Sequence, residues 1–600
     1  MAINFVFTQL GAQLMNKKST SNPKAWNRSQ INPSLASDLY AISHFDAAQT
    51  DSTPYGPSSS LDPSEISIEW TESENGRKTL YAGPINIMTL ASTNENYMWQ
   101  VGTDKVSYVD KSNWTRSDSC TDEALANHSE SDNSDNHESI DDTQFDSFGQ
   151  LTPDDLVGAT EEDKKKDMDD KLKSFFGNDY STRIQNGLYP LVSKKEVLYV
   201  KYGNFICGYK ADNADDPKKI CAKYELENPG EKIADDPKLN EAIVGMSMTY
   251  DGYLIVVFLS GIGIIDPQLK GSGDGYHCYQ AFGDGEEISN SIAVDEDENG
   301  NSGIYVASSS QSTGYMRKLV WVREEEKLYF QKDEGENDKG AWAATYQISD
   351  SEPPVIKKGL GTGSTPTLMG FGNGSDELVV ITDGAQKMNL LAFWRNEIPE
   401  YAGGLRLADR IQVKCGLTDK KYRSLDDNLW IQTEQSVVVH EYGAFVVNNI
   451  PADDSAENWF YEEEEKNNLI LQVSLVGPVY MGPRGVERFE WNPTNHKWEH
   501  KWGRHDIPST SMVPIYSDNG KMVIVSGYND DNDNDKYWQL VGLSWDDGTL
   551  VYKINLSNKN YGNGAYSIPQ FLDDNTLIFN SIVGPTRIDL RQAEMRKGNS

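Results

Sequence analysis

One hairpin pattern recurs along this 600-residue chain and constrains its fold more than any other feature. Each copy has small or apolar residues, then a turn, then a strand of β-branched or aromatic residues. Repeated hairpin units are typical of a β-propeller or a β-solenoid, because each unit needs its neighbours to bury its apolar face. The clearest copies are Gly245–Phe258, Ser291–Val306, Thr365–Thr382, Ser436–Val447, Ser511–Val525 and Ser567–Phe579.

Two weaker copies, at 84–90 and 188–200, bring the number of units to about eight. One propeller blade needs roughly 40–50 residues, and the copies are spaced somewhat more widely, so several blades carry loop insertions. We therefore predict an all-β fold, a seven- or eight-bladed β-propeller with a partly helical, acidic insertion. A series of β-sandwiches is the alternative, and the strand alternation excludes a helical solenoid.

The composition narrows the range of partners. The net charge of −37 would repel nucleic-acid phosphates and an anionic membrane surface, so neither is an expected partner. Cationic ligands, Ca²⁺ or a saline environment are compatible with this acidity, which also serves simply to keep a large β-protein soluble. No stretch of the chain reaches the length of a transmembrane helix.

Composition shifts divide the chain into four parts. We expect a polar N-terminal arm at 1–75, the first propeller strands at 76–114, an acidic insertion at 115–178, and the remainder of the propeller at 179–600. The insertion has many acids and few large apolar residues, so part of it is expected to be disordered. Within it, Thr152 as N-cap and Pro153 at the first helical position predict a helix that runs to about Phe176.

The N-terminus does not read as a signal peptide. Residues 1–15 are uncharged, and Lys17 and Lys18 follow them, whereas a signal peptide carries its positive charge before the apolar core. We interpret Ile3–Phe7 as a possible strand. This strand, or the region around Pro84, is expected to close the ring by pairing with the last strands of the chain.

Several phrases resemble the blades of the PQQ-like, quinoprotein-type β-propeller superfamily. In Leu543–Ser557, Asp547-Gly548 forms the turn and Tyr552 occupies the aromatic position. Phe489–Trp502 has the same order of strand, turn and aromatic residue. His44–Pro57 is similar to the segment that often precedes the first blade. The resemblance implies the fold and favours an exported protein. The absence of a recognisable signal peptide argues against export.

The same resemblance does not carry over an active site. Quinoprotein alcohol dehydrogenases have a pair of adjacent cysteines beside the cofactor, and none of the five cysteines here is adjacent to another. Their calcium ligands and catalytic aspartate match no motif of this chain. PQQ is therefore not expected as a cofactor. A Cys207–Cys221 disulfide and isolated thiols both remain open.

The best metal candidate is an acidic turn. Asp295, Asp297, Asn299 and Asn301 place oxygen atoms at alternate positions, and Gly300 is the sixth residue, as at the start of a calcium loop. Val306 stands at the twelfth position, where an EF-hand has a bidentate glutamate. A calcium loop and an ordinary polar hairpin turn are both compatible with this pattern. A second acidic turn, Asn529–Asp535, lacks the glycine and is interpreted as a solvated loop.

Other catalytic patterns are missing from the sequence. His496, His500 and His505 form the one local histidine cluster, and we interpret them as surface residues rather than zinc ligands. His440 lies within an apolar run and is interpreted as a core histidine. The chain has no GxSxG, no HExxH and no phosphate-binding loop with its lysine.

These observations favour a non-catalytic binding or scaffold propeller. Such a protein would recognise a protein, a glycan or a small ligand through the loops at one end of its channel. The alternative is a quinoprotein-like oxidoreductase, or a lyase or hydrolase, with its active site in the central channel. Catalytic groups of a propeller come from different blades and leave no local motif, so the sequence does not separate these classes.

Overall fold

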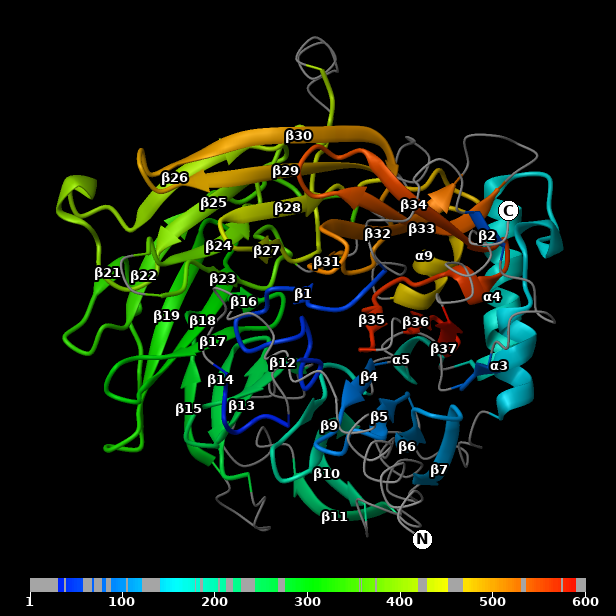
Figure 1. The fold of residues 1–600 in the computed structure, drawn as a ribbon, viewed down its shortest axis with the longest axis horizontal. Helices are drawn as coiled ribbons and strands as arrows, with labels where there is room; N and C mark the ends of the chain where they lie inside the picture. The colour runs from blue at the N-terminus through cyan, green and yellow to red at the C-terminus, as the bar shows by residue number, and fades with distance from the viewer. Residues whose placement is uncertain are drawn as a thin grey trace, which may run out of the picture.

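The computed structural model describes residues 31–589 except 37–38, 58–66, 70–77, 82–87, 104–105, 121–140, 179, 184–186, 203–204, 212–219, 228–242, 268–275, 356, 358, 373–374, 419–428, 452–467, 530–535 and 574–575. The described strands form eight sheets arranged around a central axis. Figure 1 shows this ring, which is a β-propeller of eight blades, as the repeated hairpins predict.

Each blade is built from consecutive antiparallel strands, and in blade 7 two further strands, β1 (Ser52–Thr53) and β2 (Ser67–Glu69), join the sheet by parallel pairing. Blade 1 is β4 (Met88–Ala91), β5 (Tyr97–Val101), β6 (Val106–Asp110) and β7 (Thr115–Cys120). Blade 2 is β8 (Leu191–Val192), β9 (Leu198–Tyr202), β10 (Phe205–Ala211) and β11 (Ile220–Glu227). Blade 3 is β12 (Ile243–Met248), β13 (Leu254–Phe258), β14 (Gly261–Ile265) and β15 (Tyr276–Ala281). Blade 4 is β16 (Glu287–Ile288), β17 (Ala293–Glu296), β18 (Ser302–Ser309), β19 (Gly314–Val322), β20 (Lys327–Tyr329), β21 (Gly335–Glu336) and β22 (Trp342–Tyr346).

The remaining four blades follow in chain order. Blade 5 is β23 (Thr367–Met369), β24 (Leu378–Thr382), β25 (Asn389–Trp394) and β26 (Leu407–Gln412). Blade 6 is β27 (Val438–His440), β28 (Gly443–Val447), β29 (Arg484–Asn492) and β30 (Lys497–Pro508). Blade 7 is β31 (Ile515–Ser517), β32 (Met522–Asn529), β33 (Tyr537–Ser544) and β34 (Leu550–Ser557), extended by β1 (Ser52–Thr53) and β2 (Ser67–Glu69). Blade 8 is β35 (Gln570–Phe571), β36 (Thr576–Ser581), β37 (Gly584–Asp589) and β3 (Lys78–Thr79).

The last blade closes the ring with a strand from the N-terminal part of the chain. Lys78 and Thr79 of β3 lie opposite Arg587 and Thr586 of β37 in an antiparallel pair. The closing strand thus lies shortly before the region around Pro84 that the sequence suggested. The other candidate, Ile3–Phe7, lies outside the described residues.

The insertion after blade 1 is helical where the structure describes it. It contains α3 (Asp142–Gly149), the 3-10 turn η1 (Pro153–Asp155), α4 (Glu161–Phe176) and α5 (Tyr180–Arg183). Thr152 caps only η1, because Leu156 is extended, and the longer helix begins after a second capping box built on Thr160. Strand β7 extends blade 1 to Cys120, past the expected boundary at 114. The stretch 121–140, where disorder was expected, lies outside the described residues.

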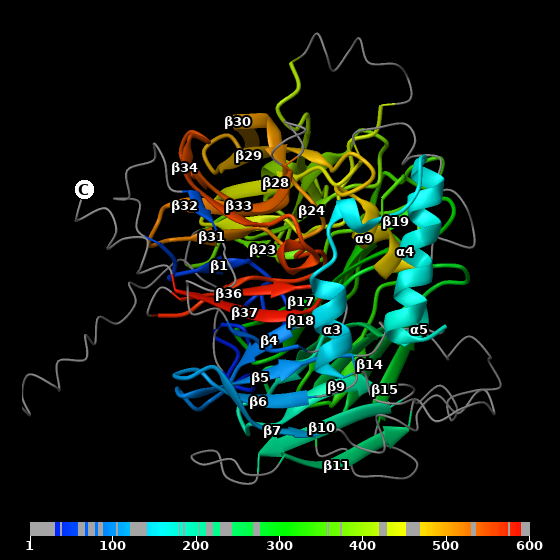
Figure 2. The same cartoon turned by 90° about the vertical axis from the view of Figure 1, so that its right-hand side faces the viewer.

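These helices pack on a short helix from blade 6. Phe148, Leu172 and Phe176 form one buried cluster with Leu471 and Leu475 of α9 (Leu469–Leu475). Two 3-10 turns complete the helical segments, η3 (Glu400–Ala402) and η4 (Asn560–Gly562), and η4 contacts α3. Figure 2 shows α3, α4, α5 and α9 gathered on one side of the molecule. None of the described helices is long and apolar enough to cross a membrane.

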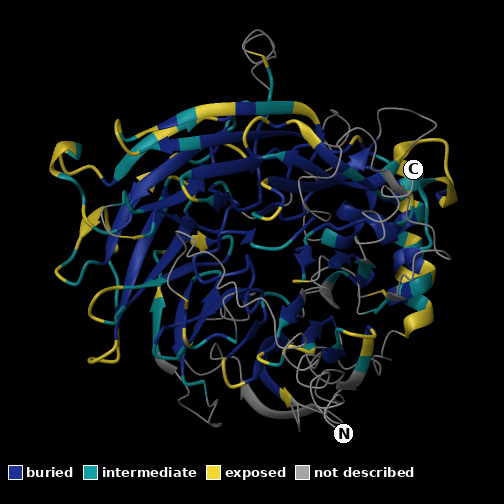
Figure 3. Ribbon diagram, in the orientation of Figure 1, coloured by how far each residue is buried: buried dark blue, intermediate teal, exposed yellow. Residues whose placement is uncertain are grey.

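Most of the core lies between neighbouring blades. Trp502 of blade 6 and Trp545 of blade 7 belong to one buried cluster, and the indole N–H of Trp502 donates to the Trp545 carbonyl at 2.9 Å. Tyr552, the aromatic residue of the blade phrase, is 3% exposed and packs in a cluster shared with blades 8, 1 and 2. Burial of each such ring stabilises the fold by about 1.5–3 kcal/mol, so the repeated aromatics serve blade packing. Figure 3 shows these buried strands within a rim of exposed loops.

Residues 32–57, which we call the axial segment, fill the centre of the ring. Its residues from Tyr40 to Thr53 are all buried, and Figure 1 shows the segment in dark blue near the axis. The turns of this path use left-handed backbone at five residues other than glycine: Tyr40, His44, Phe45, Gln49 and Asp51. Such conformations cost roughly 1–2 kcal/mol each and persist where surrounding contacts fix them.

Those contacts come from the innermost strand of every blade. Backbone carbonyls of successive residues accept from successive blades: Ala47 from Val294, Ala48 from Leu368, Thr50 from Val439 and Asp51 from Tyr516, at 2.7–3.0 Å. On the other side, Ala41 and Tyr40 accept from Val192 and Ala91, the Tyr40 hydroxyl donates to Phe571 O, and the Asn32 amide donates to Met248 O. The axial segment is thus a hub to which all eight blades are attached.

Candidate functional site

The mouth of the channel lies at the end where the innermost strands begin. These strands all run in the same direction along the axis, so the residues just before them converge at one end of the ring. The axial segment both enters and leaves at the opposite end, because Ser34 bonds Tyr250 O and Gly56 O accepts from Asn519. One end of the channel is therefore closed by the chain itself, and the other end carries the converging loops.

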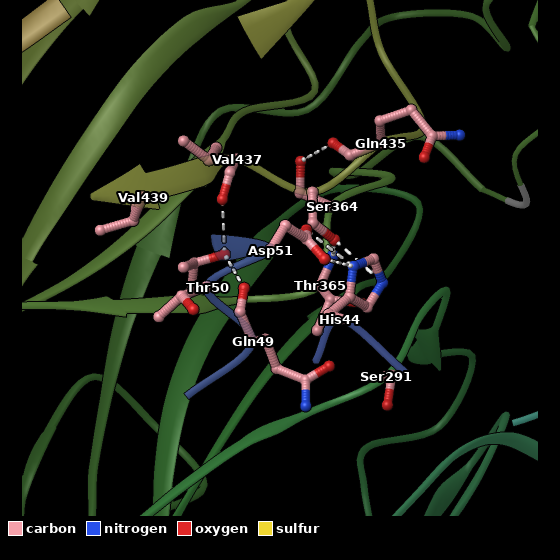
Figure 4. A network of polar contacts seen from close by, with 12 residues as sticks. His44, Gln49, Thr50, Asp51, Ser291, Ser364, Thr365, Gln435, Val437 and Val439 are labelled. Atoms are coloured by element: carbon pink, nitrogen blue, oxygen red, sulfur yellow. Dashed lines mark hydrogen bonds and ion pairs between the residues drawn. The ribbon is translucent and has the colours of Figure 1, made fainter. Parts of the chain in front are cut away.

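The floor of the mouth is a buried histidine–aspartate pair. His44 Nδ1 lies 2.9 and 3.0 Å from the two carboxylate oxygens of Asp51, and its Nε2 lies 3.4 Å from the hydroxyl of Ser436. Figure 4 shows the pair pointing toward one another among the loops of blades 5 and 6. Burial raises the pKa of Asp51, while the neighbouring imidazole partly lowers it. His44 thus anchors the tip of the axial segment.

The order Ser436–His44–Asp51 is that of a serine-hydrolase triad, but the surroundings differ. Ser436 Oγ already accepts the backbone N–H of Thr365 at 3.1 Å, and all three triad-like side chains are 5% exposed or less. A nucleophile needs room beside it for a carbonyl and for oxyanion donors. The arrangement therefore serves better as a structural clamp than as a hydrolytic centre.

Above this floor, ionisable groups from four loops face one another. Glu434 precedes β27 and is 7% exposed; Tyr566 precedes β35, and its hydroxyl donates to Glu434 Oε2 at 3.2 Å. Lys357 lies in the loop before β23 and is half-buried; its ammonium nitrogen bonds Gln432 Oε1 at 2.9 Å and the Gly361 carbonyl. Tyr189, before β8, is also half-buried and donates to Asn290 at 3.0 Å.

Burial shifts the proton equilibria of these groups toward their neutral forms. It raises the pKa of Glu434 to about 8 and lowers the pKa of Lys357 to about 7. Burial also raises the pKa of the nearby Asp383, whose carboxylate accepts two hydrogen bonds from Asn389 and one from Ala385 N. A lysine and a glutamate that interact with each other and are both poised near neutral pH are a physical marker of a functional site.

The space beside Glu434 is small. A cavity of about 20 Å³ lies between Glu434, Ser511, Asn449 and Trp538, with room for about one water molecule. A pocket that encloses a drug-sized ligand needs about 300–1,000 Å³. This cavity can therefore enclose at most a small polar group.

The residues of the expected calcium loop form a hairpin turn between β17 and β18. Asp297 accepts from the backbone N–H groups of Asn299 and Asn301 and from the Asn301 side chain, at 2.8–3.0 Å. Asp295 points elsewhere, since its carboxylate accepts from Tyr305 at 3.1 Å and lies 3.4 Å from Arg395. Among the described residues no group of three or more metal-ligating side chains converges. Calcium binding by this loop stays a prediction.

The histidines of the expected surface cluster have separate partners. His496 pairs with Asp376 at 2.8 Å and stacks on Tyr401, whereas His500 pairs with Glu487 at 3.1 Å. His440 is partly buried and stacks on Tyr516. The register of β10 and β11 places Cys207 opposite Glu225 and Cys221 opposite Lys210, so the strand pairing does not bring the two cysteines opposite each other. The Asn529–Asp535 turn lies almost wholly outside the described residues.

The sequence did not single out Glu434, Lys357 or Tyr566. Their positions did carry a signal, because Glu434 and Tyr566 stand one or two residues before the repeat starts at Ser436 and Ser567. Loops before the innermost strands always meet at the mouth of a propeller. A search restricted to those positions would have found Glu434 and Tyr566, but not Lys357, which lies eight residues before the repeat start at Thr365.

Comparisons with known proteins place the chain by its fold. No protein-family model matches it. A stretch of 355 residues is 28% identical to an uncharacterized protein of Archaeoglobus fulgidus, covering 58% of this chain and 61% of that relative. The match thus spans less than two thirds of the relative, and it assigns no activity.

Solved structures with a similar arrangement include three enzymes. A quinohemoprotein alcohol dehydrogenase of Pseudomonas putida HK5 is 10% identical with a TM-score of 0.46, covering 91% of this chain and 76% of the dehydrogenase. A europium-containing methanol dehydrogenase is 10% identical with a TM-score of 0.40, covering 91% and 90%. Virginiamycin B lyase from Staphylococcus aureus is 11% identical with a TM-score of 0.31, covering 66% and 92%. The expected resemblance to quinoprotein-type propellers is confirmed for the fold alone.

The channel of this chain does not fit a quinone cofactor. The axial segment occupies the centre of the ring, and its carbonyls are bonded to the innermost strands. A planar tricyclic group on the axis would have to displace Tyr40–Thr53, whose residues are all buried. The residues that fill the axis therefore do not fit PQQ.

Proposed function

We propose that this chain is a non-catalytic binding propeller whose channel mouth recognises a neutral polar ligand of the glycan class. The observation that supports this proposal is the convergence of Glu434, Lys357, Tyr189 and Tyr566 from four separate loops above the closed channel. Binding sites of propellers are built from such loops, because the blades hold them rigidly while their sequences vary.

The protonation states favour a neutral ligand. At a pH between about 7 and 8, most Lys357 is a neutral amine and most Glu434 is a neutral acid. The mouth then offers hydrogen-bond donors and acceptors without a formal charge on these two groups. A charged ligand would gain no ion pair from them and would still lose hydration on entry.

The tyrosines favour a sugar over other neutral ligands. Tyr189 and Tyr566 are both half-buried, so part of each side chain is accessible, while their hydroxyls donate to Asn290 and Glu434. A sugar ring has an apolar C–H face that packs on an aromatic ring and hydroxyls that pair with donors and acceptors. The small cavity beside Glu434 also suits one hydroxyl of a larger glycan better than an enclosed small molecule.

Calorimetric titration of the whole chain with a panel of neutral mono- and oligosaccharides at pH 7.5 tests this proposal. We expect saturable binding of a neutral sugar, and binding at least about tenfold weaker when the same sugar carries a carboxylate or an ammonium group. Tyr189→Ala should also weaken binding about tenfold, whereas Tyr401→Ala, an exposed tyrosine outside the mouth, should not. Failure of every neutral sugar to bind, or unchanged binding by Tyr189→Ala, would contradict the proposal.

One observation favours a second candidate, a glycan lyase or hydrolase. A carboxylic acid with a pKa of about 8 is protonated at neutral pH and can serve as a general acid. Mass spectrometry of the bound sugar after prolonged incubation separates the two candidates. Cleavage that is lost in Glu434→Gln would favour the enzyme, and an intact sugar would favour the binding protein.

A further inference from the structure

A second pocket, distinct from the channel mouth, lies between blades 4 and 5, and we call it the interblade pocket. Its volume is about 530 Å³, within the range of sites that hold small molecules. Strands of blade 4 form one wall, and the loop after β25 forms the other. The lining residues that matter for binding are Asp297, Gly303, Lys318, Glu336, Asn396 and Glu397.

A buried lysine lies in the wall of this pocket. Lys318 is only 8% exposed, and its ammonium nitrogen donates to Asn396 Oδ1 at 2.6 Å. Gly303 keeps the space around the lysine open. A methyl group at Gly303 would lie 2.9 Å from Lys318 Cε and 2.5 Å from Asp295 Oδ1, so any larger residue would displace these side chains.

The other cations near the pocket are already paired with carboxylates. Arg395 lies 3.4 Å from Asp295, Lys339 lies 2.5 Å from Glu325, and Arg406 pairs with Glu336. Lys318 differs, because among the described residues no carboxylate lies within ion-pair distance of its nitrogen, and its bonded partner is a neutral amide. An ammonium group has three donors, so two donor positions are open to a ligand.

The rim of the pocket has the opposite charge. Glu397 is exposed, and Asp297 stands at the edge of the same opening, whereas the charge of the exposed Glu336 is shared with Arg406. These acids repel a dianion such as a phosphate, while they attract a cationic group. A ligand that complements both Lys318 in the wall and the acidic rim carries one negative charge at its inner end and one positive charge at its outer end.

We propose that the interblade pocket binds a zwitterionic ligand of the amino-acid class, with its carboxylate on Lys318 and its ammonium group at the acidic rim. A carboxylate would accept charge-assisted hydrogen bonds from the open donor positions of Lys318 and remain within reach of the Asn396 side-chain amide. Burial lowers the pKa of Lys318, and a bound carboxylate would oppose that effect by stabilising the charged form. This proposal is independent of glycan binding at the mouth.

Calorimetric titration of the whole chain with each of the twenty common amino acids tests the proposal. The best binder is then compared with its amide, which lacks the carboxylate, and with its desamino acid, which lacks the ammonium group. We expect the amide to bind at least about tenfold more weakly, because it cannot accept as an anion from Lys318. The desamino acid should lose less, since the rim is exposed to solvent.

Two variants connect the binding to the pocket. Lys318→Met keeps the buried stem and removes the charge, and it should abolish saturable binding; Lys327→Met, on an exposed lysine of the same blade, is its control. Glu397→Gln changes only the exposed rim, so it keeps the test informative if Lys318→Met fails to fold, and it should weaken the amino acid but not the desamino acid. No saturable binding of any amino acid, an amide that binds as tightly as the acid, or a folded Lys318→Met with unchanged affinity would overturn the proposal.

Discussion

The channel mouth and the interblade pocket differ in the partners of their buried ionisable groups and in the space beside those groups. At the mouth, burial moves Glu434 and Lys357 toward their neutral forms, and the adjoining cavity has room for about one water molecule. Between blades 4 and 5, the arginines are paired with acids, one lysine lacks such a pair, and the space is about 530 Å³. Burial also lowers the pKa of Lys318, so the two regions differ in how their charged groups are paired and in the space beside them, not in whether burial shifts a pKa. We expect variants at one of the two sites to act independently of the other site.

The largest effect is expected at the floor of the mouth. His44→Ala leaves the wholly buried Asp51 carboxylate without its partner, so the free energy of unfolding should fall by about 3–5 kcal/mol. Chemical denaturation measures the loss. The double variant His44→Ala/Asp51→Ala should lose less than the sum of the two single variants, because it removes both members of the pair. Additive losses would show that the two side chains act independently.

A smaller loss is expected from a variant aimed at the pocket alone. Arg395→Met removes the cation beside Asp295, which is partly buried, and should lower the free energy of unfolding by about 2–3 kcal/mol. The freed Asp295 carboxylate would then compete for Lys318, so amino-acid binding should weaken while glycan binding stays unchanged. Titration of the variant with both ligands measures the two effects. Equal losses at both sites would contradict their independence.

The pH dependence of stability should carry the signature of Glu434. Its pKa is about 8 in the folded chain and near 4.5 when exposed, so the folded state binds more protons between these values. Stability from this group is therefore full below about pH 4.5 and is lost as the pH rises to about 8. Glu434→Gln should remove about 1 kcal/mol or more of that decline, measured as the melting temperature from pH 5 to 8.

Lys357 acts in the opposite sense and in a different range. Its pKa is about 7 in the folded chain and near 10.5 when exposed, so its contribution to stability grows as the pH rises from about 7 to 10.5. Glu434→Gln should leave this alkaline limb in place. A pH profile identical to that of the unmodified chain would show that Glu434 is an ordinary ionised carboxylate.

The smallest effect concerns the acidic turn at the rim of the pocket. Asp297→Ala removes three hydrogen bonds that stabilise an exposed turn, so the free energy of unfolding should fall by about 1 kcal/mol or less. Thermal melting with and without millimolar Ca²⁺ measures this loss. A melting temperature that rises with Ca²⁺ in the unmodified chain, but not in Asp297→Ala, would support the calcium loop; an unchanged one supports the hairpin turn.

The blades could be predicted from the sequence because their signal is local. In Ser511–Val525, alternating residues and a turn specify two neighbouring strands, β31 and β32, without reference to any distant residue. The axial segment could not be predicted in this way. Tyr40–Thr53 has neither a helical nor a strand period, and its backbone partners lie on blades that are far away in the sequence.

The functional candidates show the same difference between local sequence signals and long-range contacts. The spacing of Asp295 and Asp297 suggested one metal site, but Asp295 lies in strand β17 while Asp297 lies in the turn after it, and the two carboxylates have different partners. The significance of Glu434 and Lys318 depends on burial, which no motif encodes. Composition indicated an acidic surface, yet it gave no hint of the cations that gather between blades 4 and 5.

The axial segment also has a consequence for the order of assembly. Tyr40 bonds Phe571 across 531 positions of the chain, so the hub leaves the ribosome long before its last partners exist. Contacts this distant in sequence slow folding, because a large loop must close before they contribute. Until the last blades are made, the early blades therefore surround an axial segment that lacks part of its hydrogen-bond partners. The edges of their strands are unpaired and exposed. Such an intermediate is prone to aggregation, and we expect the full-length chain to depend more on chaperones than its stable final ring would suggest.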